Sequence, residues 1–248
     1  MRNFLFSSIV LAFSGAVFCG SYPSSYPRCH YGDVECITKA FNDVLKLGKD
    51  GISELNIPSF EPLRVAKVDI IQDTTSNIAI NLVLHDADIY GISNANIYRV
   101  VGFDKDISKS KFEVNALIPK LRISSKYIVD GKVLILPITG RGDSVLNLEN
   151  ADVKVKFKIE PFVKDGKMYG KIGKHKSLLN TSKLSLKLEN LFNGNKALGD
   201  NMNNFINENW EIIFQELKPA ISEALGKVIM DIVENAFSSI PYNELFLE

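Results

Sequence analysis

Few residues of this 248-residue chain have the types and spacing that catalysis or metal binding requires. The three histidines, His30, His85 and His175, are widely separated, and the chain has no His-x-x-x-His or Cys-x-x-Cys spacing. Zinc sites and histidine-activated nucleophiles depend on such clusters. The sequence therefore predicts no metal, no cofactor and a protein that is not an enzyme.

Two short segments resemble functional motifs. Residues 91–95, Gly-Ile-Ser-Asn-Ala, approach the pattern around a hydrolase nucleophile, but that motif leads into a helix, whereas a β pattern follows here. Residues 141–143, Arg-Gly-Asp, match an adhesion tripeptide, but glycine and aspartate are also common turn residues. We interpret both segments as turns. An esterase-like enzyme would instead need a serine, a histidine and a carboxylate that meet in one pocket.

The N-terminus indicates export. Arg2 precedes an almost uncharged run from Phe4 to Phe18, which has the length of a signal-peptide core and is too short to span a membrane. Cleavage after Cys19 fits the preference for small residues near the cut, and cleavage after Ala16 is the main alternative. We expect residues 1–19 to be a signal peptide, residues 20–248 to form a single domain, and the mature protein to be secreted and extracellular.

The cysteines support this assignment. Removal of Cys19 leaves Cys29 and Cys36, an even pair in an oxidising compartment. A disulfide between them would stabilise the fold by about 2.5 kcal/mol on the chain-entropy model. A metal site that adds His30 is the alternative, but further ligands at zinc spacing are lacking.

In an exported chain, Asn180 is also a glycosylation candidate, because it begins an Asn-Thr-Ser sequon.

Charge and hydropathy restrict the partners. The 29 basic residues are balanced by 29 acidic ones, so no global field attracts nucleic acid or an anionic membrane. No second apolar stretch approaches the length of a membrane span, and we expect no stable membrane insertion. Apolar residues make up 46% of the chain, which is typical of a folded protein. We expect a monomer.

The periodicity changes along the chain. Apolar residues recur at helical spacing from Asp33, a candidate N-cap, to Leu47. Alternation of apolar and polar residues, typical of strands with one buried face, then follows. It predicts strands at 63–71, 78–90, 95–103, 112–124, 126–129, 133–138, 145–159 and 184–191. Because hairpins rather than helices join them, the sheet should be antiparallel and strongly twisted.

Two Asp-Gly pairs, at residues 130–131 and 165–166, predict tight hairpin turns. Between them, one face of a long strand is apolar, as at Val155 and Phe157, and the opposite face carries Lys154 and Lys156. We interpret the lysine face as solvated, and it also protects against edge-to-edge pairing.

From Ala197 to Phe237 the apolar spacing is helical again, and we predict one long helix bent at Pro219. A sheet with one apolar face and a helix with a broad apolar stripe each need a partner. The predicted fold is therefore α+β, a long and strongly curved antiparallel β-sheet wrapped around a long C-terminal helix. The axis of this roll either packs solid, which is the default, or leaves an elongated cavity.

Several segments carry a family resemblance through their order and spacing. They are Cys29-x6-Cys36, Ile-Pro-Ser-Phe-Glu-Pro-Leu at 57–63, Leu-Pro-Ile-Thr-Gly-Arg-Gly-Asp at 136–143, Leu-Glu-Asn-Leu-Phe-Asn-Gly at 188–194, Asn-Glu-Asn-Trp at 207–210 and Pro-Tyr-Asn-Glu-Leu-Phe at 241–246. Together they resemble the insect takeout and haemolymph juvenile-hormone-binding protein family, and more closely its takeout branch. The resemblance covers essentially the whole mature chain.

The resemblance implies the tubular lipid-binding, super-roll fold with an N-terminal disulfide. It implies an internal tunnel for a small hydrophobic partner, such as juvenile hormone, another terpenoid or a fatty acid. It also implies secretion into haemolymph or sensory fluids, and roles in feeding, circadian or chemosensory physiology.

Aromatic side chains are the candidate lining of such a tunnel, although aromatic residues in these patterns also form ordinary core. The candidates are Tyr90, Phe103, Tyr127, Phe157, Phe205 and Trp210. The favoured function is thus a ligand carrier. The alternative is an extracellular signalling or interaction protein with a solid core and no ligand, which should expose an apolar patch.

Overall fold

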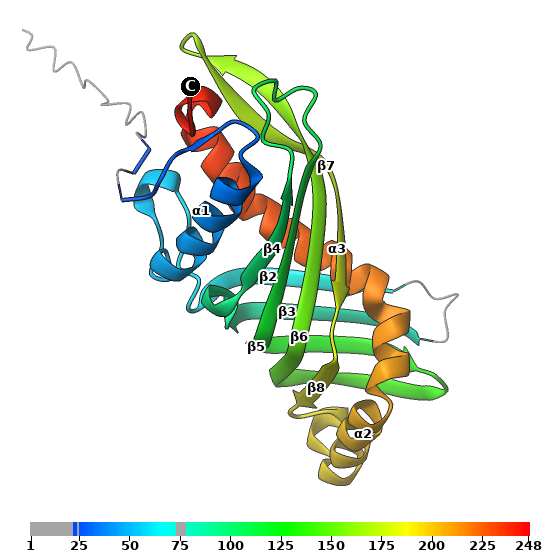
Figure 1. The fold of residues 1–248 in the computed structure, drawn as a ribbon. Coiled ribbons are helices and arrows are strands. Elements are labelled where there is room, and N and C mark those ends of the chain that lie inside the picture. Colours follow the sequence, from blue (N-terminus) through cyan, green and yellow to red (C-terminus); the bar gives the residue numbers. More distant parts are fainter. Residues whose placement is uncertain (1–21, 24, 73–77) are drawn as a thin grey trace, which may run out of the picture.

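The structure, a computed structural model, describes residues 22–23, 25–72 and 78–248. The segment predicted as a signal peptide, residues 1–19, lies outside the described residues. Within the described part of the chain, one long antiparallel sheet, a small two-stranded sheet and three α-helices are arranged as an elongated molecule (Figure 1). No helix of this part is both long and apolar enough to cross a membrane.

The large sheet is built on two very long strands, β5 (Phe112–Val133) and β6 (Leu136–Lys164), which pair along nearly their whole length. The flanking strands are β2 (Leu63–Ile71), β3 (Ile78–Tyr90), β4 (Asn96–Val101), β7 (Lys167–Asn180) and β8 (Lys183–Leu188). Every pairing in this sheet is antiparallel. The predicted fold, a curled antiparallel sheet with a long C-terminal helix, is confirmed (Figure 1).

The sheet turns a corner where Pro119 of β5 lies opposite Asn150 of β6. The pairing of β5 with β6 skips both residues, and Asn150 has a left-handed φ of 49°. Proline cannot donate to a ladder, so an interruption is expected there. The neighbouring strands also change at this level, with β4 and β7 on one side and β3 and β8 on the other. Two half-sheets therefore share only β5 and β6 (Figure 1).

The first helix, α1 (Val34–Leu47), begins as predicted. The Asp33 side chain caps it by accepting a hydrogen bond of 3.0 Å from the Cys36 backbone N–H. Cys36 is bonded to Cys29, so the predicted disulfide is confirmed. Cys29 belongs to β1 (Cys29–His30), which pairs in parallel with β9 (Phe246–Leu247) and so joins the two ends of the fold. Short 3-10 turns lie at η1 (Ser53–Leu55), η2 (Ile92–Asn94), η3 (Phe192–Gly194) and η4 (Tyr242–Glu244).

The prediction of one continuous C-terminal helix is wrong. Two helices, α2 (Lys196–Glu208) and α3 (Trp210–Ser239), meet at Asn209, whose φ of −109° and ψ of 21° are not helical. The Asn209 backbone and side-chain amides both donate to the Phe205 carbonyl, at 3.1 and 2.8 Å, and so end α2. Pro219 lies inside α3 without ending it, as predicted.

The hairpin predicted at residues 130–131 is also wrong. Asp130 and Gly131 lie within β5, and the turn falls at Leu134 and Ile135 instead. Gly131 has a φ of 144°, and a Cβ atom there would overlap the carbonyl oxygen of Ala79 on β3. This glycine therefore permits a close approach of two strands rather than a turn.

Of the three remaining turn predictions, two are correct and one is wrong. The turn between β6 and β7 lies at Asp165 and Gly166, with φ angles of 52° and 73°, and this hairpin is confirmed. Residues 91–95 form the predicted turn around η2. The Arg-Gly-Asp segment at 141–143, by contrast, is not a turn, because it pairs with β5 inside β6.

Helix α2 binds the edge of β8 through two asparagines one helical turn apart. Asn203 accepts a hydrogen bond from the Leu188 backbone N–H at 2.8 Å and donates to its carbonyl at 2.9 Å. Asn207 makes the same pair of bonds with Leu186, at 2.8 and 2.7 Å. Since alternate residues of a strand present their backbone groups to the same side, the two amides take the place of a neighbouring strand.

Candidate functional site

The inner face of the curled sheet is apolar. In β6 the side chains of Val153, Val155, Phe157 and Ile159 are buried, and the β5 partners of the first three are buried or half-buried. Helix α3 lies along the concave side, with its most extensive contact against β7 and further contacts with β2, β3 and β8 (Figure 1). Since β2 and β7 are the two ends of the strand order, the helix closes the roll between them.

One end of this interior is filled by aromatic rings. Phe112 is stacked on Phe157 with ring centroids 5.2 Å apart, and Phe103 meets the edge of Phe112 at 4.9 Å. Phe237 of α3 reaches the same group. Tyr242 closes it, donating a hydrogen bond of 2.7 Å to the Asp104 carbonyl, and burial raises the pKa of its phenol. Two predicted site residues, Phe103 and Phe157, therefore lie together here.

The other end of the interior is aliphatic and contains Tyr127. This tyrosine is buried, and its hydroxyl donates a hydrogen bond of 2.7 Å to the Glu189 carbonyl. Burial, and then the nearby Glu189 charge, raise the pKa of Tyr127 to about 12. Phe205 of α2 is half-buried against the same cluster. The hydroxyl oxygen of Tyr127 keeps lone pairs that can accept a hydrogen bond.

The last two predicted site residues lie apart from both groups. Trp210, half-buried at the start of α3, packs against the core and borders an open depression with Thr181 and Glu216. Tyr90 is exposed at the end of β3, next to Ile89, whose side chain is buried. The six predicted residues thus occupy both ends of the roll and its surface rather than one pocket.

Sequence reasoning missed the part of α3 that faces the interior between those ends. Ile221, Leu225, Val228 and Ile232 follow one another at helical spacing and pack against the buried core, yet each is only half-buried. Their spacing was visible as part of the apolar stripe. The sequence did not show which residues of the stripe face the middle of the roll, because the break between α2 and α3 at Asn209 was not predicted.

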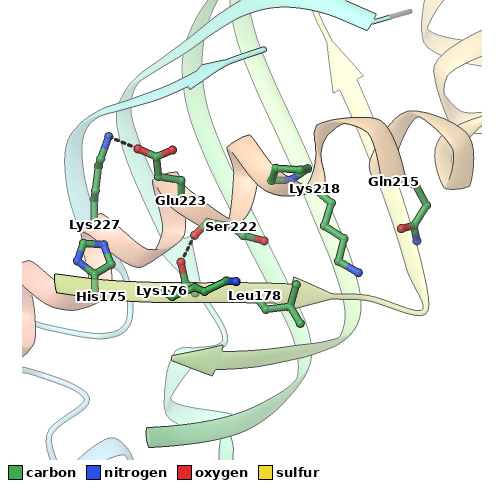
Figure 2. A pocket seen from close by; sticks show the side chains of 10 residues that line it. His175, Lys176, Leu178, Gln215, Lys218, Ser222, Glu223 and Lys227 are labelled. Carbon is green, nitrogen blue, oxygen red and sulfur yellow. Dashed lines mark hydrogen bonds and ion pairs between the residues drawn. The ribbon is translucent and has the colours of Figure 1, made fainter. Parts of the chain in front are cut away.

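A groove of about 580 Å³ runs along the outside of the seam between α3 and β7 (Figure 2). It is lined by His175, Lys176, Ser177, Leu178, Gln215, Lys218, Pro219, Ser222, Glu223 and Lys227. In Figure 2, Gln215 and Lys218 lie at one end, and Lys227, paired with Glu223 at 3.0 Å, lies at the other. The lining carries more positive than negative charge.

Small residues form the floor of this groove. The Ser177 hydroxyl donates to the Ser222 carbonyl, and the Ser222 hydroxyl accepts a hydrogen bond of 3.0 Å from the Leu179 backbone N–H. A Cβ atom at Gly226 would overlap the Ser177 hydroxyl. The spacing of Ser222 and Gly226, four residues apart on one helix face, was a sequence signal for close contact that the apolar pattern alone did not reveal.

Other candidate motifs occupy defined positions. Ser93, the serine of the elbow-like segment, donates its hydroxyl to the Glu61 carboxylate at 2.8 Å. Asn180, the sequon asparagine, ends β7 and accepts a hydrogen bond from Lys218, and its glycosylation stays a prediction. Among the described residues, no three His, Cys, Asp or Glu side chains form a group that could hold a metal ion.

Comparison with known proteins gives matches over nearly the whole chain. Residues 8–247 match the model of the family described as haemolymph juvenile hormone binding protein. The circadian clock-controlled protein daywake of Drosophila melanogaster is 32% identical over 230 residues, covering 91% of this chain and 88% of the relative. The daywake protein of Drosophila yakuba is 29% identical, with the same coverage of 91% and 88%.

The fold also matches a solved structure. The crystal structure of Takeout 1 from Epiphyas postvittana is similar with a TM-score of 0.72 and 26% sequence identity. The match covers 88% of this chain and 97% of that one. The curled sheet and the long helix thus recur together in a protein of similar length.

Proposed function

This chain belongs to the haemolymph juvenile hormone binding protein family, and from that premise we propose that it is a secreted carrier of one elongated hydrophobic ligand. The ligand is a juvenile hormone, another terpenoid or a fatty acid, held between the sheet and α3. One observation carries the proposal. Helix α3 closes the roll between its edge strands, so that strands and helix surround an apolar interior.

The middle of α3 supports an interior that a ligand can enter. Ile221, Leu225, Val228 and Ile232 face the core and still keep accessible surface. Side chains in a fully packed interior would lose that surface, since protein cores are close-packed. The aromatic group at one end and Tyr127 at the other would then bound the length of the ligand.

Burial of apolar surface provides the binding energy. A ligand with about sixteen methylene-sized groups gains roughly 13 kcal/mol when it leaves water. Association and ordering costs of several kcal/mol reduce that gain. The remainder corresponds to an affinity in the micromolar range or better.

The test is to express the full chain in insect cells and to analyse the secreted protein. We expect native mass spectrometry to detect a bound apolar compound, and solvent extraction to release it. The stripped protein should take up a fluorescent fatty acid or juvenoid with saturable binding. A protein that is repeatedly free of ligand and takes up neither probe would contradict the carrier and favour the signalling or interaction protein with a solid core.

Two variants test where the ligand lies. Leu225→Trp adds a large ring on the inner stripe of α3 and should reduce probe affinity at least ten-fold. Ile212→Trp adds the same ring at an exposed position of the same helix and should leave probe affinity unchanged. If both variants bind the probe like the parent protein, the ligand is not held along this stripe.

The names of the daywake relatives support a physiological proposal as well. Both are described as circadian clock-controlled, and we propose that this carrier acts in circadian or related feeding and chemosensory physiology. Transcript measurements over the day in the source tissue would test it. A constant transcript level under light–dark cycles would contradict the circadian part without affecting the carrier.

A further inference from the structure

The hairpin that joins β6 to β7 exposes apolar side chains at its tip, residues 161–168. Val163 is 70% exposed, Met168 43% and Phe162 39%. Val163 and Met168 are cross-strand partners on one face of the ribbon, and Phe162 lies on the other face, stacked on Tyr169 with ring centroids 5.7 Å apart. The tip therefore presents apolar groups on both faces.

The turn at the tip projects from the fold. A Cβ atom at Gly166 would meet no atom within 4 Å apart from those of its own chain neighbours. In Figure 1 the hairpin, coloured yellow-green, extends beyond the other elements at that end of the molecule. Lys167, next to the turn, pairs with Glu244 of η4 at 2.8 Å and so ties the hairpin to the C-terminal segment. The exposed side chains of Phe162, Val163 and Met168 can therefore touch a surface while the hairpin stays attached to the fold.

The hairpin carries an excess of positive charge. Residues 154–176 contain eight lysines and two acidic residues, Glu160 and Asp165, in a chain that is neutral as a whole. Three of the lysines pair with carboxylates outside this segment, Lys154 with Asp152, Lys156 with Glu113 and Lys167 with Glu244, which leaves an excess of three positive charges. Within the described part of the chain, Lys158, Lys164 and Lys171 form no ion pair within 4 Å and are exposed. Their charge is thus available to an anionic partner.

We propose that residues 161–168 dock this protein on an anionic lipid surface. The apolar side chains at the tip enter the interfacial layer, while the flanking lysines lie at the level of the negatively charged head groups. Membrane-surface elements combine apolar and basic residues in this way, since burial of apolar area and attraction to anionic lipid add together. A soluble polyanion would use the lysines but would gain little from Val163, Met168 and Phe162.

This docking goes beyond the carrier function and does not depend on it, because vesicle binding requires no ligand in the interior. For a carrier, contact with a lipid surface would shorten the distance an apolar ligand must travel through water. The two proposals fail separately, since probe uptake and vesicle binding are measured independently.

The test is co-sedimentation of the full mature chain with vesicles of phosphatidylcholine alone and of phosphatidylcholine with phosphatidylserine. We expect binding to the anionic vesicles that weakens in high salt. The tip variant Val163→Ser/Met168→Ser should bind them at least five-fold more weakly, and so should the charge variant Lys164→Glu/Lys171→Glu.

The hairpin at the other end of β6 offers matched controls. Ile135 in that turn is 91% exposed, and Lys132 beside it is exposed as well. Ile135→Ser and Lys132→Glu should each bind the anionic vesicles within two-fold of the parent protein. A tryptophan introduced by Val163→Trp should be quenched by brominated acyl chains, and one introduced by Ile135→Trp should not be.

Three outcomes would overturn the proposal. One is the absence of binding to anionic vesicles. Another is an equal loss of binding in the tip variants and in the control variants. The third is binding that depends on Lys164 and Lys171 but not on Val163 and Met168, with heparin as an effective competitor, because the partner would then be a soluble polyanion.

Discussion

The Ser222 hydroxyl of α3 accepts a hydrogen bond of 3.0 Å from the backbone N–H of Leu179 in β7. Leu179 belongs to an edge strand, so this N–H has no strand neighbour on that side, and the helix supplies the missing acceptor. The Ser222 carbonyl in turn accepts from Ser177. One short stretch of helix thus bonds twice to the strand that it covers.

Ser222→Ala should leave the Leu179 N–H buried without a partner, which costs about 1–3 kcal/mol of stability. Hydrogen exchange at the Leu179 amide should accelerate more than exchange in the centre of β5. Ser238→Ala, an exposed serine near the end of the same helix, should change stability by less than about 0.5 kcal/mol. Unchanged protection at Leu179 in Ser222→Ala would show that another acceptor serves this group.

Gly226→Ala should destabilise the protein although alanine is the better helix former. The added Cβ would overlap the Ser177 hydroxyl and lie 3.0 Å from Ser177 Cβ. Overpacking of this kind costs about 1–3 kcal/mol. The control is Gly199→Ala in α2, where the nearest atom outside the helix backbone is 3.7 Å away, and there we expect a gain of up to about 1 kcal/mol. Urea unfolding would measure both, and a gain in both variants would contradict a tight seam.

Asn207→Asp should loosen α2 from β8. The carboxylate can still accept from the Leu186 N–H, but it would face the carbonyls of Leu186 and Asn203, to which the amide now donates at 2.7 Å each. We expect a loss of about 1–3 kcal/mol at neutral pH. The loss should shrink as pH falls towards about 4, where the new carboxyl group is protonated and can donate again.

Asn204→Asp is the matched control for this change. Asn204 lies on the same helix and is exposed, so the same charge is added where water solvates it. Thermal unfolding at pH 7 and at pH 4.5 would compare the variants. Equal stability of Asn204→Asp and Asn207→Asp at pH 7 would argue against the role of the side-chain amide at β8.

Tyr127 should make stability fall in alkaline solution. Its pKa is raised from 10.0 in the unfolded chain to about 12 in the fold, chiefly by burial. Between these two values the unfolded state releases a proton that the folded state retains, so this stabilising effect is complete below pH 10 and is lost as pH rises towards 12. Tyr127→Phe should therefore lose stability less steeply above pH 10, although it also lacks the hydrogen bond to Glu189.

Melting temperatures from pH 8 to pH 11.5 would measure this slope. Tyr90→Phe removes an exposed tyrosine and should follow the curve of the parent protein. An identical alkaline slope in Tyr127→Phe and the parent would show that Tyr127 does not titrate with unfolding.

Local pattern was sufficient for the bounds of some strands. The predicted strands at 63–71 and 78–90 coincide with β2 and β3, although the buried side changes phase near Ala66 in β2 and near Asp86 in β3. The turn at Leu134 and Ile135 was not predictable in this way, because neither residue is a usual turn former and Leu134 adopts a φ of 56°. The long register between β5 and β6 fixes that turn, and the register is a property of the whole sheet.

The candidate site was harder to predict from the sequence than the strands were. Aromatic type alone suggested Phe103 and Phe157, which do meet in one buried group, but also Tyr90, which is exposed. Alternation showed only that Tyr90 and its neighbour Ile89 point to opposite faces of the strand. The pairing of β3 in the sheet decides which of the two faces is inside. The seam at Gly226 depends on Ser177 of β7, which lies 49 residues earlier in the sequence, and no local rule joins the two.

The asparagines of α2 have a consequence for the behaviour of concentrated protein. A sheet that is not a closed barrel leaves backbone donors and acceptors at its margins, and these can recruit strands from other molecules into fibrils. Side-chain amides occupy those groups at Leu186 and Leu188. At these two residues the margin therefore offers no template for polymerisation while α2 stays in place, and proteolysis or mutation that releases the helix would create one.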